Sequence, residues 1–371
     1  MTALQSNTVH KAIVRRGRWC AVESRPDRPP GPGELAVAPE KVSLCGTDIQ
    51  ILRGDRDDPS DIVGHEGAAR VVGVGAGVDG FRIGDRVVIN PTHPDDSSFL
   101  LGHNVEGLFQ ERVVIAASAV SGGLVSLLPD ELSASRATLV EPFAVVRYAL
   151  AALAAATPDT LIIHGDGLIG NLAAFLAPHF LLPSGQVVVV HRSSEGMEWT
   201  GRHAPAGTRS ALDTDPTLYD GVGDAVAVLV ATHRGGTIPA IEGAVRGLGA
   251  RLRAVHPIGG LAPDARTPLL PGVDLPAVRA ANTGGPWPPS TVTFAQRDRR
   301  IVCSGNRGVT NTQLVAAAGE LVDWGGSIDA LLTHEVSVEE APRYLDAICA
   351  GRSRIVDGEL VMRLVVDFGA R

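Results

Sequence analysis

Three glycines between two apolar runs constrain the fold of this chain most. They have the spacing G-x-G-x-x-G and are Gly165, Gly167 and Gly170. The apolar run Leu161–Ile163 precedes them, a helical segment is predicted over Leu172–Phe180, and a β-branched run covers Val187–Val190. The stretch therefore has the size of one strand–helix–strand unit. A plain glycine turn in an α/β sheet is the simpler interpretation.

In such a unit, the glycines allow a tight turn and let the backbone approach a pyrophosphate. The first turn of the following helix has free N–H groups and a partial positive charge, which favour phosphate. We therefore expect a dinucleotide site in which Leu168 and Ile169, between the last two glycines, also contact the cofactor.

The residues after the second apolar run bear on which dinucleotide binds. An acid at the end of that strand would hydrogen-bond a ribose 2′-hydroxyl. This chain has His191, Arg192 and Ser193 there, and its first acid is Glu195. Arg192 can pair with a 2′-phosphate and the hydroxyl of Ser193 can donate to it. The sequence therefore predicts NADP(H) in preference to NAD(H), unless Arg192 is only a solvated turn residue.

Length and composition exclude several classes of protein. A chain of 371 residues is too long for most single cores, so two domains are expected. The net charge is −8 and the basic residues are scattered, which argues against a nucleic-acid partner. The four cysteines lie far apart and none forms C-x-x-C. The sequence shows neither a signal peptide nor an uninterrupted membrane span, so a cytoplasmic protein is expected.

The pattern of apolar segments predicts two kinds of domain. Residues 12–115 contain short strands separated by glycines, which is typical of a partly closed, barrel-like β domain. From residue 146 to 304, helices alternate with Val/Ile-rich strands, as in a doubly wound parallel sheet of Rossmann type. We therefore assign 1–145 with 305–371 to one domain and 146–304 to the other. Residues 261–289 read as an irregular connection, with strands expected at Leu331–His334 and Leu360–Phe368.

Four side chains outside the glycine turn suggest a metal site. They are Cys45, His65, Glu66 and Glu141. One thiolate, one imidazole and one or two carboxylates can hold zinc and leave a position for exchange. Each residue alone has a simpler interpretation, since a lone cysteine usually behaves as a small buried hydrophobe.

Several motifs together resemble the zinc-dependent medium-chain alcohol dehydrogenase/reductase family. They are CGTD at 45–48, GHEGAARVVGVGAGVDGFRIGDRVVI at 64–89, VEPFAV at 140–145, GDGLIG at 165–170 and LLTHEVSVEEAPRYLDAI at 331–348. The Glu141-Pro142 pair resembles the polyol branch, which includes sorbitol and threonine dehydrogenases. The resemblance implies a GroES-like catalytic domain beside the Rossmann domain, and a homo-oligomer, either a dimer or a tetramer.

The resemblance also implies roles for individual residues. Cys45 and His65 would be zinc ligands, and Glu66 and Glu141 would share the remaining contact, directly or through a water. Thr47 would pass a proton from the reacting hydroxyl, and Asp48 would orient a ligand. Many family members hold a second, structural zinc with four cysteines, and region 91–107 of this chain has none. We therefore expect one catalytic zinc per chain.

The expected reaction is hydride transfer between NADP(H) and a secondary alcohol or ketone. Polar residues in 91–107 favour a hydroxylated small molecule such as a polyol, sugar or cyclitol, with Arg307 and Asn311 as candidate substrate contacts. Arg363 is a candidate phosphate contact. The alternatives are a zinc-free reductase of a conjugated double bond, which would lack the metal ligands, and a non-catalytic nucleotide-binding protein.

Overall fold

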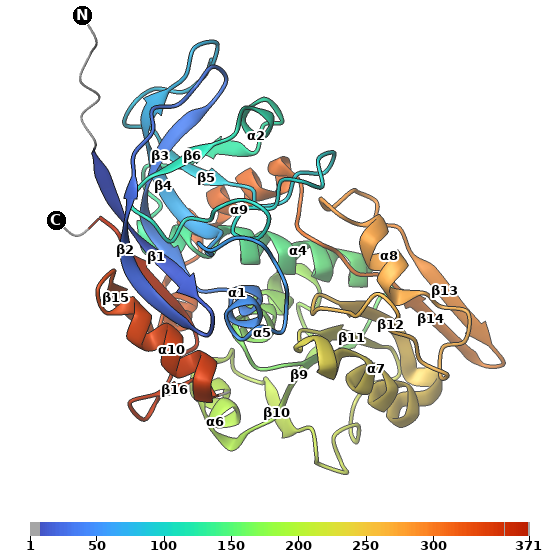
Figure 1. Cartoon of the computed structure of the whole chain (residues 1–371). Coiled ribbons are helices and arrows are strands. Elements are labelled where there is room, and N and C mark those ends of the chain that lie inside the picture. The colour runs from blue at the N-terminus through green and yellow to red at the C-terminus, as the bar shows by residue number, and fades with distance from the viewer. Residues whose placement is uncertain (1–7, 352, 370–371) are drawn as a thin grey trace, which may run out of the picture. The chain divides into compact units, whose positions relative to one another are not determined.

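The computed structural model describes residues 8–351 and 353–369, which form two compact units (Figure 1). The first unit comprises Met1–Glu141, Asn311–Gly325 and Leu332–Arg371. The second unit comprises Pro142–Thr310 and Gly326–Leu331. Helix α4 (Val140–Ala154) begins at the end of one unit and continues into the other.

A seven-stranded sheet forms the centre of the second unit, and every neighbouring pair is parallel except the last. In spatial order the strands are β10 (Arg209–Leu212), β9 (Gln186–His191), β8 (Thr160–His164), β11 (Val226–Val230), β12 (Leu252–Pro257), β14 (Arg299–Cys303) and β13 (Val292–Gln296). Every residue of β8 and β11 is buried, as expected in the middle of a parallel sheet. Apart from the antiparallel edge strand β13, this is the doubly wound order, so the predicted Rossmann sheet is confirmed.

The helices of the second unit follow from this strand order. From β8 the chain moves through α5 (Leu168–Phe180) and α6 (Ser194–His203) toward β10. It then returns past β8 to β11 and continues through α7 (Arg234–Leu248) to β12. Right-handed crossovers in opposite directions put helices on opposite faces. The strand order reverses at β8, and ligands of such sheets bind at the carboxyl ends of the strands there.

Two expectations for the second unit need correction. Helix α5 begins at Leu168, earlier than Leu172, because the chain turns into the helix directly after its N-cap residue Gly167. The region 261–289 contains helix α8 (Leu275–Ala281), and the 3₁₀ helix η1 (Gly249–Arg251) lies directly before β12. The carboxylate of Asp274 caps α8 by accepting from the Ala277 N–H at 2.9 Å, which stabilises the start of the helix.

The first unit contains a second sheet and a separate hairpin. The sheet order is β15 (His334–Ser337), β18 (Leu364–Asp367), β3 (Leu35–Ser43), β4 (Glu66–Val74), β5 (Arg86–Ile89) and β7 (Val125–Leu127), with β6 (Val113–Ile115) paired to β3. The hairpin consists of β1 (Val9–Arg16) and β2 (Trp19–Pro26). Gly17 has φ +67° in its two-residue loop, a position that favours glycine. Among the described residues the path from β15 to β7 is open at both ends, which agrees with a partly closed form.

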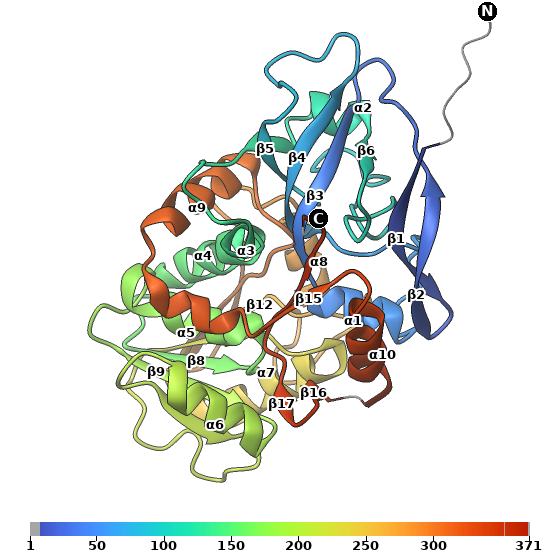
Figure 2. The same ribbon diagram turned by 90° about the vertical axis from the view of Figure 1, so that its left-hand side faces the viewer.

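The remaining elements of the first unit are helices of 4 to 13 residues and two two-residue strands. They are α1 (Gly46–Leu52), α2 (Ala117–Ser121), α3 (Ala134–Ala137), α9 (Asn311–Asp323), α10 (Ala341–Gly351), β16 (Ile355–Val356) and β17 (Glu359–Leu360). Figure 2 shows α10 beside α1, and the two helices are in contact.

Two strands near the C-terminus differ from the prediction. Of the expected strand Leu331–His334, only His334 is in a strand, as the first residue of β15, and Leu331 ends the 3₁₀ helix η2 (Gly326–Leu331). The expected strand Leu360–Phe368 is divided between β17 and β18, which leaves Arg363 directly before β18. No helix among the described residues combines the length and apolarity that crossing a bilayer requires.

Candidate metal centre and glycine turn

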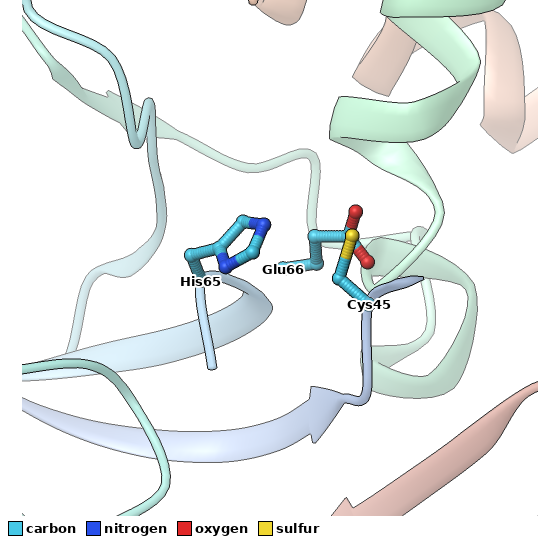
Figure 3. Close-up of side chains that lie close together, drawn as sticks. All are labelled: Cys45, His65 and Glu66. Carbon is cyan, nitrogen blue, oxygen red and sulfur yellow. The ribbon is translucent and has the colours of Figure 1, made fainter. Parts of the chain in front are cut away.

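Cys45, His65 and Glu66 converge in the first unit. Cys45 is the N-cap residue of α1, His65 ends the loop before β4, and Glu66 is the first residue of that strand. One ligand atom from each side chain lies within 4.8 Å of the other two (Figure 3). Within residues 8–351 and 353–369, this is the one group of three such side chains close enough to share a metal ion. The donor set of sulfur, nitrogen and oxygen suits zinc.

Asp48 explains why the two ligand-bearing loops meet. Its fully buried carboxylate accepts from the Cys45 N–H at 2.9 Å and from the Gly64 N–H at 3.3 Å. Its Oδ1 also lies 3.3 Å from Nδ1 of His65. A carboxylate behind a ligating histidine fixes the direction of the imidazole ring. Asp48 therefore fixes both the start of α1 and the orientation of His65.

The charges in this cluster depend on one another. Burial raises the pKa of Asp48, but attraction to His65 outweighs it, so this pKa lies below its usual value. Burial lowers the pKa of His65, but Asp48 and then Cys45 raise it well above the usual value. Loss of hydration and repulsion from Glu66 raise the pKa of the Cys45 thiol. A metal ion would have to displace the thiol and imidazolium protons, so metal affinity should rise with pH.

Arg363 and Glu141 both lie next to the side chain of Glu66. Nη1 of Arg363 is 2.7 Å from Oε2 of Glu66, and the two side chains are 1% and 2% exposed. Arg363 also donates to the carbonyl of Thr138. Loss of hydration and repulsion from Glu66 raise the pKa of Glu141 to about 8. The guanidinium therefore balances the charge of Glu66, and the adjacent Glu141 is mostly protonated near pH 7.

The expectation that Arg363 contacts a phosphate is wrong, because its guanidinium is buried against Glu66. The sequence does contain a signal for this role. An arginine directly before the apolar strand Leu364–Asp367 needs a buried acid as partner, since an unpaired buried charge is costly.

His103 is a second residue whose place the sequence did not reveal. It comes from region 91–107, and its ring centroid lies 5.1 Å from that of His65. Burial and repulsion from His65 lower the pKa of His103 to about 4, so its ring is neutral near pH 7. The region without cysteines thus contributes an imidazole that packs against an expected metal ligand.

The glycine turn of the second unit has the shape that a pyrophosphate needs. Gly165 has φ +111°, and a Cβ there would lie 2.6 Å from the carbonyl oxygen of Ala231. A Cβ on Gly170 would lie 1.7 Å from the carbonyl oxygen of Gly165. Gly167 is the N-cap of α5, and Leu168 and Ile169 are in its first turn, where N–H groups have no partner within the helix. A dinucleotide therefore fits this turn.

The residues after β9 differ in their local roles. Arg192 is exposed, and the hydroxyl of Ser193 caps α6 by accepting from the Gly196 N–H at 3.2 Å.

The candidate substrate residues fall in different units. Arg307 is exposed in the second unit, whereas Asn311 begins α9 in the first. The Asn311 Oδ1 accepts from the Asn90 side chain at 2.8 Å, so part of its amide is already engaged.

The fold and site together define a class: a GroES-like β unit with a Cys-His-Glu cluster, in one chain with a Rossmann unit that has a dinucleotide turn. Comparisons with known proteins agree. Residues 31–123 match the Alcohol dehydrogenase GroES-like domain. The chain is 30% identical over 192 residues to L-threonine 3-dehydrogenase of Xanthomonas euvesicatoria, an alignment that covers 46% of this chain and 54% of that protein. It is 27% identical over 209 residues to sorbitol dehydrogenase of Bacillus subtilis, covering 51% and 57%.

A likeness in fold alone covers nearly the whole chain. A protein described as a zinc-binding dehydrogenase, from Sinorhizobium meliloti and solved with NADP, superposes with a TM-score of 0.73 at 18% identity, covering 97% of this chain and 99% of that one. Residues 31–123 therefore form an alcohol dehydrogenase GroES-like domain, and the chain resembles zinc-type medium-chain alcohol dehydrogenases, the polyol branch in particular. It spans about half the length of the curated relatives that it matches.

Proposed function

We propose that this chain is a dehydrogenase with one zinc ion that transfers hydride between NADP(H) and a secondary alcohol or ketone, with a polyol, sugar or cyclitol as substrate. The convergence of Cys45, His65 and Glu66 carries the proposal. Zinc, when bound, supplies Lewis-acid chemistry to the alcohol oxygen, and the nicotinamide accepts the hydride. A zinc-free reductase would not need this cluster.

The side chains around the cluster divide the remaining tasks. The Thr47 hydroxyl lies 3.4 Å from the Cys45 sulfur and is half-buried, so it is placed to take the hydroxyl proton of the substrate and pass it toward solvent. Asp48 holds the His65 ring in one orientation. Glu66 is the nearer carboxylate, and Glu141 would act beside it, directly or through a water.

The first test is activity itself. We expect steady NADPH oxidation with a polyol-derived ketone, and polyol oxidation with NADP, each lost after dialysis against a chelator and restored by zinc. A panel of polyols, cyclitols and simple alcohols, followed at 340 nm, checks the substrate class. Turnover confined to aliphatic or benzylic alcohols would contradict the polyol assignment, and turnover unaffected by the chelator would contradict the zinc assignment.

The cofactor preference can be tested at Arg192. A guanidinium pairing with the 2′-phosphate contributes about 1.5–3 kcal/mol, so Arg192→Gln should raise the Kd for NADPH at least about ten-fold. The Kd for NADH should stay nearly constant. Titration of cofactor fluorescence measures both values. Arg202→Gln is the matched control, because Arg202 is an exposed arginine of α6 that pairs with Glu198. Equal weakening of both cofactors would contradict the prediction.

A further inference from the structure

We propose that Asp166, inside the glycine turn, recognises the ribose hydroxyls at the adenosine end of the cofactor and thereby opposes Arg192. In related folds, the acid that binds the ribose hydroxyls lies at the end of the second strand, about 20 residues after the glycine turn. Here β9 ends with His191, and the next two residues are Arg192 and Ser193. The inference rests on the proposed binding of a nicotinamide dinucleotide to the second unit.

The Asp166 side chain reaches from the glycine turn to the end of the neighbouring strand. Its Oδ2 lies 3.2 Å from Nδ1 of His191, the last residue of β9. The His191 side chain is fully buried, and its Nε2 lies 3.2 Å from the Ser210 hydroxyl on β10, which fixes the ring. The carboxylate therefore occupies the position at the end of β9 where an acid from that strand would otherwise lie.

Helix α6 is shaped around the same carboxylate. A Cβ built on Gly196, in the first turn of α6, would lie 2.0 Å from Oδ2 of Asp166. The backbone of the turn is also held, since the Asn171 side chain donates to the Asp166 carbonyl at 2.7 Å. The amino end of α6 attracts negative charge, which further favours this placement.

The Asp166 carboxylate is fixed at the end of β9 and remains accessible to a ligand. Its side chain is 25% exposed, and Oδ1 has no hydrogen-bond partner among the described residues. A ribose hydroxyl can donate to that oxygen, whereas a 2′-phosphate would bring two negative charges together. The Arg192 guanidinium favours a 2′-phosphate over a ribose hydroxyl. The cofactor choice of this chain is therefore the balance of two residues, one from the turn and one from the end of the strand.

Asp166→Asn tests this inference, because it removes the charge and keeps the shape. We expect the Kd for NADPH to fall about five-fold or more and the Kd for NADH to rise by a similar factor, since repulsion and a charge-assisted hydrogen bond are both lost. Calorimetric or fluorescence titration of each reduced cofactor gives these values without turnover. Asp166→Ala should change the ratio in the same direction.

Asp220→Asn is the matched control, an exposed acid of the same unit beyond β10, and should leave both Kd values unchanged. If Asp166→Asn binds both cofactors with an unchanged ratio of Kd values, the role of Asp166 is refuted and the proposed function is unaffected. If the unaltered chain binds neither NADPH nor NADH, the proposed function fails, and this inference fails with it.

Discussion

Cys45→Ser is expected to reduce bound zinc to less than about a tenth of its native content and to lower kcat/KM about a thousand-fold, because Lewis-acid stabilisation worth several kcal/mol is lost. The substitution is nearly isosteric. It removes a thiolate ligand from a cluster whose other members, His65 and Glu66, cannot hold the ion as tightly alone. Metal analysis by mass spectrometry and steady-state kinetics measure the two effects.

The control for this variant is Cys349→Ser, which changes a half-buried free cysteine on α10, elsewhere in the same unit. It should keep its zinc and its activity. Circular dichroism should show native secondary structure in both variants. A Cys45→Ser protein that retains one zinc per chain and native kcat/KM would show that the Cys-His-Glu cluster is not the catalytic centre.

Arg363→Met is expected to destabilise the protein by about 3–5 kcal/mol, the usual cost of removing one partner of a buried ion pair. Glu66 would then stay buried without its counter-ion, with Glu141 beside it. Urea unfolding, followed separately for chelator-treated and zinc-loaded protein, measures the change in free energy of unfolding. Two-state analysis should be checked with two probes, because the chain has two units.

Two companion variants make this prediction specific. Arg343→Met removes an exposed arginine that pairs with Asp357, and should cost no more than about 1 kcal/mol. Arg363→Met combined with Glu66→Gln should recover part of the lost stability, because the unpaired carboxylate is then gone. If Arg343→Met proves as damaging as Arg363→Met, burial of the ion pair is not the cause.

Local patterns were sufficient for much of the fold. The run before Gly165 and the β-branched run after α5 form adjacent parallel strands, as their apolar character predicts. The β1–β2 hairpin turns at Gly17, where the positive φ favours the glycine that the sequence has there. Periodicity failed near residues 331–368, where the strands have two to four residues each and the pattern is too brief to fix the boundaries.

The candidate site was only partly predictable, for a physical reason. Cys45, His65 and Glu66 were found because their motifs are local in the sequence. Arg363 and His103 were not placed beside them, because contacts between distant segments depend on the tertiary fold. Asp166 was overlooked because the direction of a side chain within a turn is set by φ and ψ, which residue spacing does not reveal.

The distribution of the first unit over three stretches of chain has a consequence for biosynthesis. Residues 142–310 form most of the second unit without interruption, so that sheet can be completed while later residues are still being translated. Glu66 meets Arg363 only after the ribosome has passed position 363. The electrostatic environment of the metal cluster is therefore among the last features to mature, and a metal ion bound by a nascent chain would meet Glu66 without its counter-ion.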